Sequence, residues 1–148
     1  MRIALDFDGT IVNDEHAYDD LETPLEFLPG EFEAISALKA AGHILILWSG
    51  RSNTALRWDW QHNPLWAMNP AFDVEKWEAN KIVNQKRFQQ MLDFVEENLP
   101  DVFTYVDFGN QGKVSADLYI DDRTGNGRPD WDWIRTAYGE PLPATAAE

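Results

Sequence analysis

Short apolar runs that stop abruptly at polar residues recur along the chain and predict strands. Residues 2–7 form a short apolar run with an acidic end, residues 43–48 are almost wholly apolar, and shorter runs follow at 102–106 and 117–120. A continuous apolar run of this length is typical of a strand buried on both faces. We therefore expect two buried strands, at 2–7 and 43–48, and two further strands at 102–106 and 117–120.

Apolar residues spaced three and four positions apart predict helices between and after these strands. Residues 32–41 carry this spacing before Gly42, residues 74–98 carry it before Pro100, and residues 130–138 carry a shorter version. The residues expected to dock these helices are Phe32, Ile35 and Leu38, then Phe88, Met91, Leu92, Val95 and Leu99, and finally Trp131 and Ile134. Because strand, helix and strand are joined by short links, the pattern favours right-handed parallel βαβ units and an α/β fold.

The remaining segments are expected to connect these elements. Residues 11–30 are rich in acids, Pro and Gly, which is typical of a surface loop. Residues 52–62 predict a short helix, and residues 63–73, with two Asn-Pro pairs, predict an irregular segment. The basic residues of the long helix are expected on its solvated face, and they are Lys76, Lys81, Lys86 and Arg87.

Length and composition then narrow the class of protein. The 148 residues support one domain, expected over residues 1–138 with a small helical insert at about 53–80 and a flexible tail at 139–148. The absence of Cys excludes disulfides, thiolate zinc sites and Cys nucleophiles. A formal charge of −14 disfavours nucleic-acid binding and attracts divalent cations. With no apolar run of about 20 residues and no apolar leading segment, we expect a cytoplasmic protein with no membrane partner, and the composition is compatible with a homo-oligomer.

Polar functional groups follow three of the expected strands. They are Asp6, Asp8, Gly9 and Thr10 after the first, Ser49, Gly50 and Arg51 after the second, and Asp121 and Asp122 after the fourth. Because the carboxyl ends of parallel strands meet at one edge of a sheet, these groups are expected to converge on one crevice.

The residue types in this crevice point to phosphoryl transfer. Clustered carboxylates repel one another, and Mg²⁺ relieves that repulsion while keeping places for phosphate oxygens. Phosphate in turn needs donors, and the chain offers Ser49, Lys113, Arg51 and the amides of Gly50 and of the Gly9–Thr10 turn. In the Asp-x-Asp pair, Asp6 is placed to attack phosphorus and Asp8 to assist the leaving oxygen as an acid.

These residues resemble the motifs of the haloacid dehalogenase-like (HAD) hydrolase superfamily. The stretch from Asp6 to Ile11 resembles its first motif, residues 44–49 its second, Lys113 its motif lysine, and residues 119–122 its fourth, all in the family's order. The resemblance is strongest to small capless members. It implies a three-layer Rossmann-like parallel sheet with helices on both faces and no large cap domain.

The resemblance also implies a role for each matching residue. Asp6 would become the phosphoaspartate, and Asp8 would act as general acid and base while its backbone carbonyl holds Mg²⁺. Ser49 and Lys113 would bind the phosphoryl group. Asp121 would bind the metal directly, with Asp122 close behind it or bound through water.

The sequence therefore predicts a Mg²⁺-dependent phosphatase that hydrolyses a phosphate monoester, preferably a small metabolite or nucleotide. A macromolecular phosphate is the alternative substrate, since no large cap closes the site. A non-catalytic phosphate-binding or regulatory module is a second reading. A receiver-type signalling domain is a third, and the order of its acids and Lys along the chain counts against it.

Overall fold

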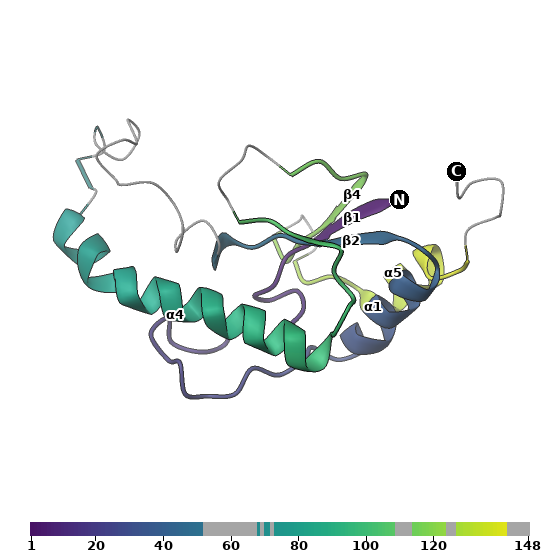
Figure 1. The fold of residues 1–148 in the computed structure, drawn as a ribbon, viewed down its shortest axis with the longest axis horizontal. Coiled ribbons are helices and arrows are strands. Elements are labelled where there is room, and N and C mark those ends of the chain that lie inside the picture. Colours follow the sequence, from purple (N-terminus) through teal and green to yellow (C-terminus); the bar gives the residue numbers. More distant parts are fainter. Residues whose placement is uncertain (52–67, 69, 72, 109–113, 124–126, 142–148) are drawn as a thin grey trace.

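The chain forms an α/β fold in the computed structural model, which describes residues 1–51, 68, 70–71, 73–108, 114–123 and 127–141 (Figure 1). Four parallel strands make one sheet in the order β3-β2-β1-β4. The strands are β1 (Arg2–Leu5), β2 (Ile44–Leu47), β3 (Tyr105–Val106) and β4 (Leu118–Ile120). The helices are α1 (Glu31–Ala40), α4 (Val74–Asn98) and α5 (Trp131–Tyr138).

The register of the sheet fixes which residues meet at its carboxyl edge. Leu5 pairs with Leu47 on one side and with Ile120 on the other. The residue after each of these strand ends therefore lies at the same level of the sheet, so that Asp6 has Trp48 and Asp121 as its neighbours.

All three described helices lie on one side of the sheet (Figure 1). Alternate strand residues point to this side, and Ile3, Leu5, Leu45 and Leu47 join the buried residues of α1, α4 and α5 in one cluster. Ala4 is also fully buried but points to the opposite side. The sheet thus has a continuous apolar core on its helical face.

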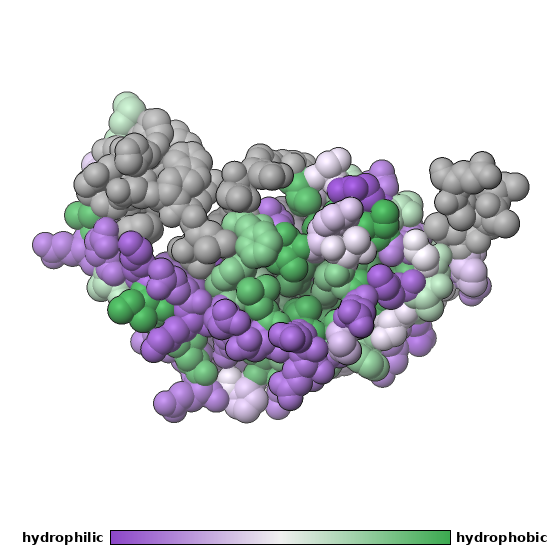
Figure 2. Space-filling view, in the orientation of Figure 1, coloured by the Kyte–Doolittle hydropathy of each residue, from purple (hydrophilic) through white to green (hydrophobic). Residues whose placement is uncertain are grey.

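The long helix α4 has a buried stripe along its packed side and a polar outer side. Met91 is fully buried, and Phe88, Val95 and Leu99 are nearly so. Figure 2 shows hydrophilic side chains along the outer side of the helix and hydrophobic ones gathered between it and the strands. Asp73 caps the helix by accepting a hydrogen bond from the Lys76 N–H at 3.0 Å.

Most sequence-based expectations for the elements are confirmed. The predicted bounds of α4 match the observed helix, and the four expected strands are all present, with β3 shorter than expected. Trp131 and Ile134 dock α5 as expected. The predicted helix at 52–62, most of the irregular segment 63–73 and the end of the tail lie outside the described residues.

Two expectations about burial before β2 are wrong. Phe32 is 45% exposed, because its place on α1 turns it outward to contact Phe27 rather than inward with Ile35. The loop expected over residues 11–30 begins inside the core, since Ile11 and Val12 are fully buried. Val12 forms isolated bridges with both Asp8 and Phe27, which draw this part of the loop under the sheet edge.

None of the described helices combines the length and the apolar character that a membrane crossing requires. The longest, α4, has 25 residues but carries charged side chains along its whole length.

Candidate functional site

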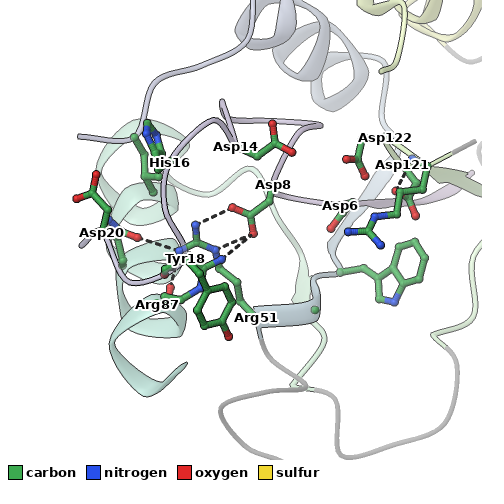
Figure 3. Close-up of a pocket in the computed structure, with 15 residues that line it drawn as sticks. Asp6, Asp8, Asp14, His16, Tyr18, Asp20, Arg51, Arg87, Asp121 and Asp122 are labelled. Atoms are coloured by element: carbon green, nitrogen blue, oxygen red, sulfur yellow. Dashed lines mark hydrogen bonds and ion pairs between the residues drawn. The ribbon is translucent and has the colours of Figure 1, made fainter. Parts of the chain in front are cut away.

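Three carboxylates from two distant parts of the chain meet at the carboxyl edge of the sheet (Figure 3). Asp6 follows β1, while Asp121 and Asp122 follow β4, and one oxygen from each lies within 4.8 Å of the others. The two strand ends are tied together because the Asp6 N–H donates to the Ile120 carbonyl at 3.0 Å. The expected convergence of Asp6 with the acids after the fourth strand is therefore confirmed.

In the acid cluster, defined as Asp6, Asp121 and Asp122, the protonated form of two members is favoured. Burial raises the pKa of Asp6 to about 8, helped by the negative charges of Asp121 and Asp122 and opposed by a hydrogen bond from the Phe7 backbone. The pKa of Asp122 is also raised, first by burial and then by its hydrogen bond with Asp121 and the charge of that neighbour. A cation that binds these oxygens would displace the protons and remove the repulsion.

The donor set of the acid cluster fits Mg²⁺. The ion prefers carboxylate oxygens at about 2.1 Å, so oxygens that share one ion lie roughly 3–4 Å apart. Side chains whose oxygens already lie within 4.8 Å of one another reach that spacing by small rotations. Asp6, Asp121 and Asp122 are therefore the residues that would hold the metal.

Gly9 lets the first loop pass close to the acid cluster. Its φ of +73° belongs to the left-handed region, and a Cβ atom placed on it would lie 2.6 Å from the Asp122 Oδ2 atom. The loop also closes on itself, since the Gly9 N–H donates to the Val12 carbonyl at 2.9 Å and the Thr10 N–H to the Phe7 carbonyl at 3.3 Å. The expectation that Gly9 and Thr10 offer these amides to phosphate is thus corrected, because both already have partners within the loop.

Thr10 anchors the same loop to the last helix. Its carbonyl accepts a hydrogen bond from the Trp131 Nε1 atom at 2.9 Å, and its side chain is fully buried. The Thr10 hydroxyl has no hydrogen-bond partner among the described residues. The residue therefore supports the loop from below rather than lining the crevice.

Asp8 points away from the acid cluster and toward Arg51. The Arg51 Nε atom donates to Asp8 Oδ2 at 2.8 Å and its NH2 group to Asp8 Oδ1 at 2.7 Å, which makes a bidentate ion pair. Arg51 is in turn fixed by the carbonyl of Arg87 at 2.8 Å and the Gln90 Oε1 atom at 2.9 Å. The Asp8 carboxylate expected as the acid is thus held beside the cluster by Arg51, which was expected as a phosphate donor.

Ser49 follows β2 and lies behind the crevice. Its side chain is buried, and its Oγ atom accepts a hydrogen bond from the Arg51 N–H at 3.1 Å. A hydroxyl that accepts in this way still has its own proton to donate, so Ser49 can serve a phosphoryl oxygen. Gly50 lines the crevice as expected, whereas Lys113 lies outside the described residues.

The crevice has a volume of about 560 Å³, a size typical of pockets for small molecules. Its acidic end is formed by the acid cluster, and the loop after β1 forms one wall. This wall includes Asp14, His16, Tyr18, Asp20 and Leu25. Arg51, Arg87 and Gln90 lie at the opposite end, and Trp48 and Arg123 also line the crevice.

Arg87 is a crevice residue that the sequence did not identify. It was expected on the solvated face of α4, but its side chain is only 14% exposed and its guanidinium lies 4.1 Å from the centre of the Tyr18 ring. The signal that could have found it is helical spacing, because Arg87 stands three residues after the buried Asn84 and four before the buried Met91.

Comparisons with known proteins give one informative similarity. No protein-family model matches the chain, and no curated protein matches it. A conserved protein of known structure from Bacteroides thetaiotaomicron is 26% identical, with a TM-score of 0.52 over 90% of this chain and 85% of its own. This similarity supports the α/β fold, and because it names no activity, the function must be argued from the site.

Proposed function

We propose that the chain is a Mg²⁺-dependent phosphatase of the HAD type that hydrolyses a small phosphate monoester through an aspartyl-phosphate. The observation that supports this most directly is the approach of Asp6, Asp121 and Asp122 to within 4.8 Å, in a crevice sized for a small molecule. The order of the sequence motifs supports the same proposal. The proposal also includes a three-layer Rossmann-like architecture without a large cap, and a cytoplasmic location.

In the proposed reaction, an Asp6 oxygen attacks phosphorus and the bond from phosphorus to the leaving oxygen breaks. Bound at Asp6, Asp121 and Asp122, Mg²⁺ would neutralise charge on the phosphoryl group and lower the pKa of Asp6 so that it is ionised. The leaving oxygen takes a proton from Asp8. Water, deprotonated by Asp8, then attacks phosphorus, which releases phosphate and restores the Asp6 carboxylate.

Asp8 has to leave its resting position for this role. Its two oxygens are both bound by Arg51, so acting as an acid requires that Asp8 break that ion pair and carry a proton to the leaving oxygen. The Ser49 hydroxyl, in the segment after β2, would donate a hydrogen bond to the phosphoryl group. Lys113 keeps its expected role of neutralising the phosphoryl oxygens.

The Asp8–Arg51 ion pair is also the observation that favours a second candidate function. A phosphate-binding or regulatory module would keep the crevice and the metal site but would have no use for a mobile acid. Such a module would bind inorganic phosphate with Mg²⁺ and would turn over no ester.

The test is hydrolysis of p-nitrophenyl phosphate with Mg²⁺ by the wild type and by Asp6→Asn. Loss of the nucleophile should lower kcat by at least about 1000-fold, which corresponds to roughly 4 kcal/mol. Asp132→Asn, an exposed acid on α5, is the matched control and should stay within about twofold. Activity of Asp6→Asn within about tenfold of the wild type would exclude Asp6 as nucleophile, and phosphate binding without turnover would favour the binding module.

A further inference from the structure

The end of the crevice opposite the acid cluster carries two arginines against one carboxylate. Arg51 binds Asp8 in a bidentate ion pair at 2.7 and 2.8 Å. The NH2 group of Arg87 lies 3.8 Å from Asp8 Oδ2, which is beyond hydrogen-bond distance. Within the part of the chain that the structure describes, the Asp8 carboxylate thus faces both guanidinium groups, and Arg51 already binds both of its oxygens.

Arg87 is half-buried and held in one orientation, and the described residues do not use all of its donors. Its NH1 group donates to the Tyr18 carbonyl at 3.0 Å, and its plane rests on the Tyr18 ring. The Tyr18 hydroxyl is itself fixed by a hydrogen bond to Asn84. A guanidinium has five donors, so Arg87 keeps donors beyond those that the described residues accept. Burial, and then the charge of Arg51, lower the pKa of Arg87, while the charge of Asp8 partly offsets them.

The other acids along the crevice wall already have partners of their own. Asp14 forms an ion pair with Arg128 at 3.0 Å. Asp20 accepts hydrogen bonds from the Glu22 and Thr23 amides and from the Thr23 hydroxyl. Among the described residues, both acids therefore bind partners other than Arg87.

We propose that Arg87, backed by Arg51, binds a second anionic group of the substrate. The proposal rests on the proposed function and narrows it: the substrate is a small phosphate monoester that also carries a carboxylate or a second phosphate. Asp8 lies between the acid cluster and the two arginines (Figure 3). A substrate lying along the crevice would place its reacting phosphate at the acid cluster and its second anion at Arg87, with the leaving oxygen next to Asp8.

The side chains suit such a ligand. Arginine binds the planar carboxylate and the phosphate group through paired N–H donors, and the Tyr18 ring holds the Arg87 fork in one orientation. An anion at this end would compete with Asp8 for the N–H donors of Arg51, which would weaken the Asp8–Arg51 ion pair. Substrate binding and release of the acid would then be coupled.

The experiment compares three aryl phosphates that differ only in their second group: phenyl phosphate, 3-carboxyphenyl phosphate and resorcinol bisphosphate. With Mg²⁺, the wild type should show kcat/KM at least about tenfold higher for one or both anionic probes than for phenyl phosphate, and which probe gains tells carboxylate from phosphate. Arg87→Gln should reduce this ratio about tenfold, mainly through KM, and Arg87→Lys should restore part of it. Lys86→Gln, which removes an exposed charge from the neighbouring position, should leave the ratio unchanged.

Equilibrium binding separates failure of this proposal from failure of the proposed function. Calorimetric titration of Asp6→Asn with Mg²⁺ and each probe measures the subsite without turnover. In one outcome, the wild type hydrolyses no ester while the anionic probes still bind about tenfold tighter than phenyl phosphate through Arg87. That result would support the anion subsite and exclude the phosphatase function. Equal binding of all three probes, or a ratio that Arg87→Gln and Arg87→Lys leave unchanged, overturns the subsite.

Discussion

Glu31 shows at the scale of one residue how burial sets protonation in this fold. Its carboxyl group lies at the start of α1 with no exposed surface, and neither oxygen has a hydrogen-bond partner among the described residues. Burial, with a smaller contribution from the charge of Glu33, raises its pKa from 4.5 to about 9. The folded protein therefore keeps a neutral Glu31 at pH 7, where an unfolded chain would ionise it.

This difference predicts a loss of stability as pH rises. The unfolded chain releases the Glu31 proton near pH 4.5 and the folded chain only near pH 9, so the free energy of unfolding should fall across that window. The free energy of unfolding of Glu31→Gln minus that of the wild type should be larger at pH 8 than at pH 5, by on the order of 1–3 kcal/mol. Urea unfolding at the two pH values measures it.

Glu33→Gln is the matched control for Glu31, because it lies on the same turn of α1 but is exposed. It should shift stability by less than about 0.5 kcal/mol at either pH. If the wild type and Glu31→Gln respond to pH in parallel, Glu31 is ionised in the folded state and the assignment is wrong.

At the scale of one element, α4 connects the core to the crevice. Met91 and Val95 face the sheet, while Arg87 and Gln90, in the turn before Met91, hold Arg51 through a carbonyl and a side-chain oxygen. The Phe94 ring packs edge-on against both Phe7 and Phe27, so the helix also contacts the loop after β1. Packing of α4 therefore positions one end of the crevice.

Met91→Ala should destabilise the protein by about 2–5 kcal/mol, because it leaves a cavity at a fully buried position. Ile82→Ala on the same helix is the control, since Ile82 is 63% exposed and its truncation should cost less than about 0.5 kcal/mol. Thermal or urea unfolding compares the two. Equal losses would mean that the burial pattern assigned to α4 is wrong.

At the scale of the whole molecule, the acid cluster joins the ends of β1 and β4, which are more than a hundred residues apart in sequence. Folding buries these carboxylates and brings them together, and burial first, with their mutual repulsion second, raises the pKa values of Asp6 and Asp122. A cation bound there would stabilise the folded state, because the unfolded chain does not assemble the site.

Mg²⁺ should therefore raise the melting temperature, with about 1.4 kcal/mol of stabilisation when its concentration is tenfold above Kd. The effect should be smaller at pH 6 than at pH 8, since protons compete for Asp6 below its pKa of about 8. Differential scanning fluorimetry with Mg²⁺, against NaCl of equal ionic strength, measures both. Asp121→Asn should lose most of the shift, and a shift equal to that of NaCl would argue against a metal site.

The sequence by itself determined the elements and the acidic end of the site. Helical spacing located α4 because every third or fourth residue of a helix faces the same side, whatever that side packs against. The approach of Asp6 to Asp121 followed from parallel strands alone, since their carboxyl ends meet at one edge. These features depend on local periodicity and on one rule of sheet geometry.

The tertiary structure decided which partners the polar side chains take. Asp8 pairs with Arg51 across 43 positions, Arg87 turns inward onto Tyr18, and the amides of Gly9 and Thr10 are used within their own loop. No local pattern contains this information, because a side chain takes whichever distant donor or acceptor the packed core brings within about 3 Å of it.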